Sequence, residues 1–149
     1  MTWRMTPELV SGFEEIDGHH RVLFQRLETA AKAAQADDLA RTKIVLAELG
    51  DDLAAHFGAE ESLMNASGYP ERGRHKSAHD LFMQDFAQLT RELATTGLSV
   101  PTVQWISTRV PEWVKFHVQV NDVPLGRYLA SKRFRPEIAR ALAGKPRAS

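Results

Sequence analysis

Apolar residues recur along most of this chain at intervals of three or four, the spacing of an α-helix that buries one face. Four such series are present, with no alternation typical of β-strands and no internal repeat. Their limits are Phe13 to Ala34, Leu39 to Met64, His75 to Leu93 and Val103 to Val120. Four helices with short connections predict an all-α protein, an up-down-up-down antiparallel four-helix bundle.

Polar and turn-forming residues separate the four series and predict the helix ends. Residues 1–12 are expected to form an N-terminal arm. Asp17 is the expected N-cap of the first helix, and Asp37-Asp38 is expected to cap the second. The second helix is predicted to stop at Ser67-Gly68-Tyr69-Pro70, the third at Gly97, and the fourth to begin at Ser99.

Glycine and proline fall inside two of the predicted helices. Gly50 and Gly58 each cost the second helix about 1 kcal/mol relative to alanine, so tertiary packing has to hold it. Pro111 lies in the middle of the fourth series and predicts a kink there. Residues 136–142, followed by Gly144, predict a short C-terminal helix.

Length and composition exclude several classes of protein. The 149 residues fit a single domain (1–149), with a bundle core of about 13–130 and a tail of 131–149. The 19 basic and 19 acidic residues balance, which disfavours a nucleic-acid partner. The absence of cysteine excludes disulfides, thiolate metal sites and thiol catalysis. No apolar run predicts membrane insertion and the N-terminus has no signal-peptide pattern, so we expect a cytoplasmic protein.

The tail differs in charge from the rest of the chain. It holds six basic residues and one acidic residue: Lys132, Arg133, Arg135, Arg140, Lys145, Arg147 and Glu137. A solvated tail is the favoured interpretation, and contact with a protein partner is the alternative.

Two predicted helices each carry a pair of possible metal ligands four residues apart. His56 and Glu60 share one face of the second helix, and His75 and His79 share one face of the third. A single histidine on a helix is usually a surface residue or a hydrogen-bonded core residue. Several imidazoles on apolar faces are costly to bury unless each finds a partner, and a metal ion is a common one.

The first and fourth helices supply further candidates. His19 and His20 compete on the first helix, and the apolar residues there centre nearer to His20, which leaves His19 facing solvent or bonded to a ligand. His117 is on the apolar face of the fourth helix. Asp122 follows it by five residues, about 140° away on an ideal helix, so the two share a site only where the helix is distorted or ends. Pro124 gives a reason for such a distortion.

The inward-facing set is therefore five imidazoles and two carboxylates, too many ligands for one ion. Two ions bridged by the carboxylates would use all seven. This mixture suits iron, and manganese less well because imidazole dominates. Four positive charges against two carboxylates also favour a bridging hydroxide. The seven residues are His20, His56, Glu60, His75, His79, His117 and Asp122.

The same residues lie in an order that is typical of a known family. The motifs are Gly12-Phe13-Glu14-Glu15-Ile16-Asp17 leading to His20, His56-Phe57-x-x-Glu60-Glu61, Tyr69-Pro70 leading to His75-x-x-x-His79, and Trp113-Val114-x-x-His117-x-x-x-x-Asp122 followed by Leu125-Gly126-x-Tyr128-Leu129. From about residue 3 to residue 129, the chain resembles the bacteriohemerythrins, the single-domain prokaryotic branch of the hemerythrin family. His19 departs from the family, which usually has an amide or carboxylate side chain there.

The resemblance implies two iron ions (Fe2+/Fe3+) per chain, joined by a hydroxo or oxo bridge. His75, His79 and His117 would hold one ion, His20 and His56 the other, and Glu60 and Asp122 would bridge them. Dioxygen would bind at the open position of the two-histidine iron and be held there as hydroperoxide. Five residues are expected to line this pocket, although all five also suit plain core packing: Leu23, Phe24, Phe57, Trp113 and Val114.

The resemblance thus implies reversible binding of dioxygen, for carriage, storage or delivery, by a monomer that is not an enzyme. Two alternatives stay open. One is an oxygen- or redox-sensing module that uses the same centre, and the other is a di-iron enzyme acting on peroxide or nitric oxide. Oxygen-activating di-iron enzymes of the bundle type present Glu-x-x-His pairs, which this sequence lacks.

Overall fold

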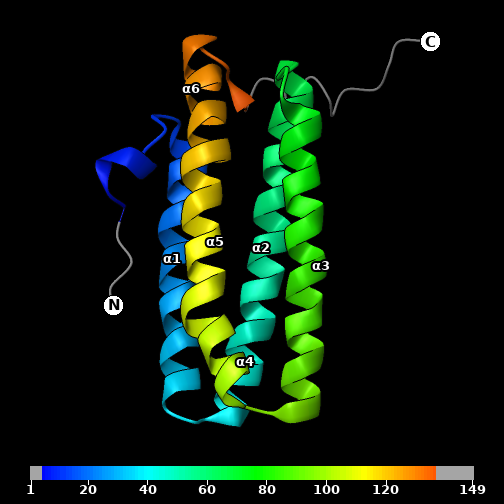
Figure 1. Ribbon diagram of the computed structural model, residues 1–149. Helices are drawn as coiled ribbons and strands as arrows, with labels where there is room; N and C mark the ends of the chain where they lie inside the picture. The colour runs from blue at the N-terminus through cyan, green and yellow to red at the C-terminus, as the bar shows by residue number, and fades with distance from the viewer. Residues whose placement is uncertain (1–4, 137–149) are drawn as a thin grey trace, which may run out of the picture.

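The computed structural model describes residues 5–136 and is an antiparallel four-helix bundle, as predicted (Figure 1). The first three rods are α1 (Glu14–Gln35), α2 (Leu39–Ser67) and α3 (Arg72–Thr96). The fourth rod is continuous and consists of α4 (Val100–Gln104), η2 (Trp105–Arg109), α5 (Val110–His117), η3 (Val118–Asp122) and α6 (Val123–Ser131). A short 3₁₀ turn, η1 (Pro7–Leu9), precedes the bundle. The part of the chain from residue 5 to 136 contains no strand.

Apolar side chains fill the space between the rods in two clusters. The larger cluster extends over most of the bundle and includes Phe24, Leu53 and Leu89. A smaller cluster, which includes Ile16 and Leu125, closes the end where α1 begins and α2 ends. Burial of each such side chain contributes about 1.5–3 kcal/mol to folding. None of the helices between residues 5 and 136 has the length and apolarity to span a membrane.

Most of the predicted helix ends are confirmed. Asp38 caps α2 by accepting a hydrogen bond from the Arg41 backbone, and Ser99 caps α4 in the same way from Thr102. The second and third rods stop at Gly68 and Gly97, both of which have a positive φ.

The prediction for Asp17 is wrong. The N-cap of α1 is Phe13, and Asp17 lies one turn inside the helix, where it is buried. Its carboxylate accepts hydrogen bonds from the backbone and hydroxyl of Ser11 and from the backbone of Gly12. Asp17 therefore ties the N-terminal arm to the bundle. A side chain at Gly126 on α6 would collide with Ser11, so glycine is required where the arm crosses the fourth rod.

Gly50 lies opposite Phe86 of α3, and a Cβ there would come within 2.9 Å of the Phe86 ring. The glycine thus permits close packing of α2 on α3 at the expense of local helix propensity.

The fourth rod contains two π-helical turns, each followed closely by a proline. In η2, the N–H of Val110 donates to the carbonyl of Trp105, and in η3 the N–H of Val123 donates to Val118. Pro111 and Pro124 come directly after these donors. Because proline offers no N–H and clashes with the carbonyl four residues earlier, an i→i+5 turn relieves both problems. The distortion predicted from Pro111 and Pro124 thus takes the form of π-helical turns within one continuous rod.

Some parts of the sequence-based description differ from the structure or fall beyond it. Ile44 and Val120, which belong to the apolar series, are exposed by 54% and 44%. The predicted helix at 136–142 and most of the basic tail lie outside the described residues, apart from residues 131–136.

Candidate metal centre

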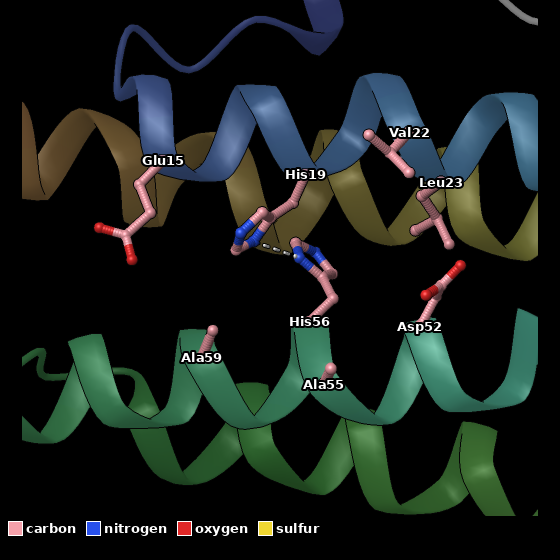
Figure 2. A pocket seen from close by; sticks show the side chains of 8 residues that line it. All are labelled: Glu15, His19, Val22, Leu23, Asp52, Ala55, His56 and Ala59. Atoms are coloured by element: carbon pink, nitrogen blue, oxygen red, sulfur yellow. Dashed lines mark hydrogen bonds between the residues drawn. The ribbon is translucent and has the colours of Figure 1, made fainter.

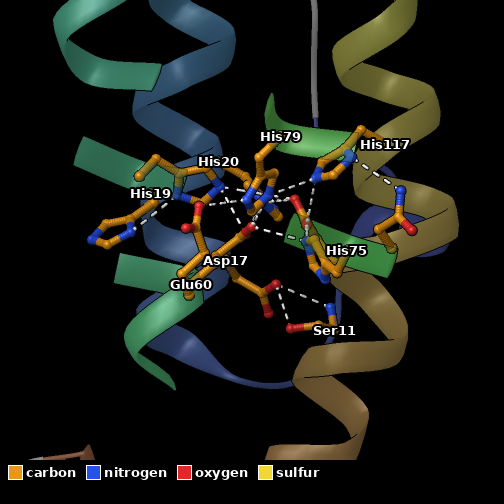
Figure 3. A network of polar contacts seen from close by, with 12 residues as sticks. Ser11, Asp17, His19, His20, Glu60, His75, His79 and His117 are labelled. Atoms are coloured by element: carbon orange, nitrogen blue, oxygen red, sulfur yellow. Dashed lines mark hydrogen bonds and ion pairs between the residues drawn. The ribbon is translucent and has the colours of Figure 1, made fainter. Parts of the chain in front are cut away.

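Seven predicted ligand side chains converge at one level of the bundle, between the two apolar clusters (Figure 3). All four rods contribute, and every one of the seven is at least 95% buried. Their ligand-type atoms form two groups, and within each group these atoms lie within 4.8 Å of one another. One group contains His75, His79 and His117, here called the three-histidine side. The other contains His20 and His56, here called the two-histidine side, and both groups contain Glu60 and Asp122.

The choice between the adjacent histidines of α1 is decided by burial. His20 is fully buried and its Nε2 lies 2.9 Å from Asp122, whereas His19 lies outside both groups. His20 is one turn after Ile16 and one turn before Phe24, which places its ring on the core side of the helix.

The π-helical turn η3 positions Asp122. On a regular α-helix this residue would be rotated away from His117, but residues five apart align in a π-helical turn. An oxygen of Asp122 lies 3.1 Å from Nε2 of His117 as a result. The backbone distortion therefore recruits a carboxylate into the centre.

Glu60 divides its two oxygens between the two sides. Its Oε1 lies 3.2 Å from Nε2 of His75 and 3.0 Å from Nε2 of His79, on the three-histidine side. Its Oε2 lies 2.9 Å from Nε2 of His56, on the two-histidine side.

Asp122 does the same. Its Oδ1 lies 2.9 Å from Nε2 of His75 and its Oδ2 lies 2.9 Å from Nε2 of His20. Both carboxylates are thus oriented as bridges between two neighbouring positions.

Several buried polar atoms here lack a hydrogen bond within the described part of the chain. They include Nε2 of His56, Oε2 of Glu60 and Oδ1 of Asp122, although each has a polar neighbour at close range. Nε2 of His79 and Nε2 of His117 also face each other at 3.1 Å. Buried polar atoms left without partners are costly. Convergence of imidazole nitrogens and carboxylate oxygens on shared points fits two metal ions of the kind that prefer mixed N and O ligands.

The carboxylates and imidazoles perturb one another strongly. Burial opposes protonation of His56, but the Glu60 charge and the close approach of both carboxylates raise its pKa to about 10. Burial likewise opposes the charged form of His75, and the nearby carboxylates of Asp122 and Glu60 raise its pKa to about 9.

The two carboxyl groups shift in the opposite direction. Burial and the Asp122 charge would raise the pKa of Glu60, yet the His56 charge and the nearby imidazoles of His20 and His56 hold it well below its usual range. Burial would also raise the pKa of Asp122, and the charge and proximity of His117 outweigh it. Both groups are therefore anionic at neutral pH, as ligands for cations must be.

Outside this cluster, other side chains hold the outer nitrogens of three histidines. Glu61 lies 3.0 Å from Nδ1 of His79, and the amide of Asn121 lies 3.0 Å from Nδ1 of His117. His19 lies 3.2 Å from Nδ1 of His56. Glu61 belongs to the motif that begins at His56, but no role was predicted for it or for Asn121. The spacing of four between His117 and Asn121 was an available signal, whereas Glu61 meets His79 only because α2 packs on α3.

Aromatic rings surround the three-histidine side. Phe57 stacks on His79 with ring centroids 4.0 Å apart, and Trp113 stacks on His117 at 4.7 Å. Trp113 also stacks on Phe82 at 3.9 Å. These contacts fix the planes of the two imidazoles and exclude water from that side.

The five residues predicted to line a dioxygen pocket are spread over both sides. Phe57 and Trp113 lie against the three-histidine side, while the Phe24 ring lies 6.4 Å from that of His20. Leu23 and Val114 are buried in the larger apolar cluster.

A groove of about 460 Å³ runs between α1 and α2 and reaches the two-histidine side (Figure 2). His19 and His56 face each other across it, and Leu23 adjoins them. The remaining lining residues are Glu15, Val22, Asp52, Ala55 and Ala59.

Comparison with known proteins gives consistent results. Residues 11–122 match the family model described as the hemerythrin HHE cation binding domain. A bacteriohemerythrin of Pseudomonas paraeruginosa is 32% identical over 77 residues, which cover 52% of this chain and 50% of that protein. The chain therefore aligns with about half the length of the Pseudomonas relatives. A bacteriohemerythrin of Stenotrophomonas maltophilia is 28% identical, with 77% and 73% covered, and a myohemerythrin of Sipunculus nudus is 28% identical, with 74% and 79% covered.

The fold is also similar to solved structures. A crystal structure of wild-type hemerythrin superposes with a TM-score of 0.76 and covers 87% of this chain and 97% of that one. Its sequence identity is 24%, so this likeness concerns the fold alone.

Proposed function

The chain belongs to the hemerythrin family, and from this membership and the geometry of its cluster we propose that it binds dioxygen reversibly at a pair of iron ions. The observation that carries the proposal is the division of oxygens in Glu60 and Asp122, each of which gives one oxygen to each side. A single metal ion would not require both carboxylates to face two positions.

In this proposal, His75, His79 and His117 hold one ion, and His20 and His56 hold the other. Glu60 and Asp122 join them. The chemistry that such a pair of ferrous ions supplies when bound is reversible two-electron transfer to dioxygen. The two-histidine side has fewer protein ligands, so an exogenous molecule is expected to bind there.

The surrounding side chains have separate tasks. Glu61 and Asn121 orient the imidazoles of His79 and His117 through their outer nitrogens. Phe24 and Phe57, whose rings lie 6.4 Å from that of His20 and 6.0 Å from that of His56, exclude water from the inner part of the two-histidine side and so limit the supply of protons there. The protein thus favours holding dioxygen over cleaving it.

The test is iron content together with the visible absorption spectrum, recorded under nitrogen, after admission of air, and after oxygen is removed again. We expect two irons per chain and a colour that appears with oxygen and disappears on its removal. Irreversible conversion to an oxidised form would refute reversible binding and favour a sensor. Sustained oxygen consumption with release of peroxide would favour an enzyme.

A further inference from the structure

The three outer-nitrogen partners differ in chemical type. His79 has the Glu61 carboxylate, His117 has the Asn121 amide, and His56 has another imidazole, that of His19. The contact joins Nδ1 of His56 to Nδ1 of His19 at 3.2 Å (Figure 2). The two rings meet edge to face, at 83° between their planes.

Two facing ring nitrogens can share only one proton, and the orientation of His56 decides where it lies. Nε2 of His56 faces Oε2 of Glu60 at 2.9 Å, inside the centre. A histidine that binds a metal through Nε2 carries its proton on Nδ1. Nδ1 of His56 then donates to Nδ1 of His19, whose own proton is on its Nε2.

We propose that His19 is a positioning residue, an inference that rests on the metal-binding function proposed above. By accepting this hydrogen bond, His19 fixes the tautomer and the ring plane of His56. It thereby sets the metal affinity of the two-histidine side.

The position of His19 makes this role specific. Both rings line the groove between α1 and α2, and His56 itself is 95% buried whereas His19 is partly exposed. His19 therefore stands between the outer nitrogen of His56 and the open groove. Without it, that nitrogen would bond to water from the groove or would have no partner.

The type of acceptor has a further consequence. A carboxylate such as Glu61 raises the basicity of the imidazole that donates to it, while a neutral imidazole does so less. His56 is thus a weaker electron donor than His79. The two-histidine side should consequently bind its ion more weakly than the three-histidine side, and a carboxylate at position 19 should strengthen it.

The experiment is an anaerobic titration of the chelated, metal-free full chain with Co2+, followed by visible absorption. The native sequence should bind two ions in two steps, and His20→Ala identifies the step that belongs to the two-histidine side. His19→Leu, which fills the space with an apolar group, should weaken that step alone by about 10–100-fold. His19→Gln restores an acceptor and should return the affinity to within a few-fold, and His19→Glu should raise it above that of the native sequence.

Two controls separate this role from a general structural one. Val22→Ala changes an exposed residue of the same groove that is not among the possible metal ligands, and should leave both steps unchanged. Glu61→Gln should weaken the other step, that of the three-histidine side. Equal Co2+ affinity in His19→Leu and the native chain would overturn the inference, as would a His19→Gln variant that behaves like His19→Leu. Failure of the native chain to bind two ions would instead refute the proposed function.

Discussion

The two sides of the candidate centre are built from similar ligands but set in different surroundings. On the three-histidine side, aromatic rings stack on His79 and His117, and a carboxylate and an amide hold the outer nitrogens. On each side one outer nitrogen, that of His75 or that of His20, has no hydrogen-bond partner among the described residues. On the two-histidine side, the outer nitrogen of His56 meets His19 beside a groove.

In the proposed function, this difference separates a position that keeps its metal ion from a position that exchanges a small ligand. Stacked rings, the Glu61 carboxylate and the Asn121 amide restrict the motion of the three-histidine side, which suits a position that would keep its ion throughout. The two-histidine side has fewer ligands and lies close to the surface. In the proposed function, it is the side on which a small ligand would arrive and leave, because the groove between α1 and α2 reaches it.

The largest loss of iron is expected when a carboxylate that joins the two sides is removed. Glu60→Ala removes an oxygen from each position and leaves excess positive charge, so we expect loss of both irons. Metal analysis and the visible spectrum provide the measurement, with Glu61→Gln as a control that should retain two irons when iron is in excess. Two bound irons and an unchanged spectrum in Glu60→Ala would contradict the bridging role.

Removing a histidine ligand from one side alone should cause the loss of about half of the bound iron. His20→Ala should bind one iron per chain, because the three-histidine side keeps all three of its imidazoles. His19→Ala, in which water from the groove can replace the lost acceptor, should still bind two irons when iron is in excess. The reverse pattern of iron content would show that the assignment on α1 is wrong.

A pH titration of the chelated protein should reveal the charge on one imidazole of each side, His56 and His75. The pKa values of His56 and His75, about 10 and about 9, lie above the 6.5 of an ordinary histidine. Their stabilising contribution is therefore complete below pH 6.5 and is lost as the pH rises through 9 to 10.

We accordingly expect the melting temperature of the metal-free protein to fall by on the order of 5–10 °C between pH 6.5 and pH 10. At acid pH, the lowered pKa values of Glu60 and Asp122 predict a contribution to the stability of the fold. This contribution is present above about pH 4 and is lost as the pH falls below it. The double variant His56→Gln/His75→Gln should make the alkaline fall smaller, and the remainder belongs to His20, whose pKa is also raised because its contact with Asp122 outweighs burial. A fall of the same size in that variant would assign the effect to other groups.

The smallest effect concerns the aromatic setting of the three-histidine side. Phe57→Leu removes the ring that stacks on His79 and should destabilise the protein by about 1–2 kcal/mol, measured by chemical denaturation. Both metal ions should still bind, since no ligand is lost. Leu53→Ala, a buried change in the same helix one turn away, is the control for simple loss of volume.

Much of this organisation was predictable from the sequence because helical spacing is local. Apolar residues at intervals of three and four determine the four rods, and the same geometry brings His56 next to Glu60 and His75 next to His79. The inward direction of His20 follows from its position between Ile16 and Phe24. The capping roles of Asp38 and Ser99 depend only on the few residues that follow them.

Other features depend on contacts between distant segments, which spacing does not encode. The sequence predicted Asp17 as a helix cap, yet its carboxylate binds Ser11 of the N-terminal arm, which crosses the fourth rod at Gly126. The turn that directs Asp122 inward depends on an i→i+5 hydrogen bond. Pro124 predicted a distortion of the helix at this point, but it did not predict the geometry of that distortion. Glu61 meets His79, and His19 meets His56, only because α2 packs between α3 and α1.

The sequence by itself therefore determined the helices and most of the residues that face inward, because both follow from the period of a single helix. The tertiary structure decided which oxygen of each carboxylate faces which side, and which group supports each imidazole. Those choices are set by distances of about 3 Å between different rods, and such distances exist only after the rods have packed.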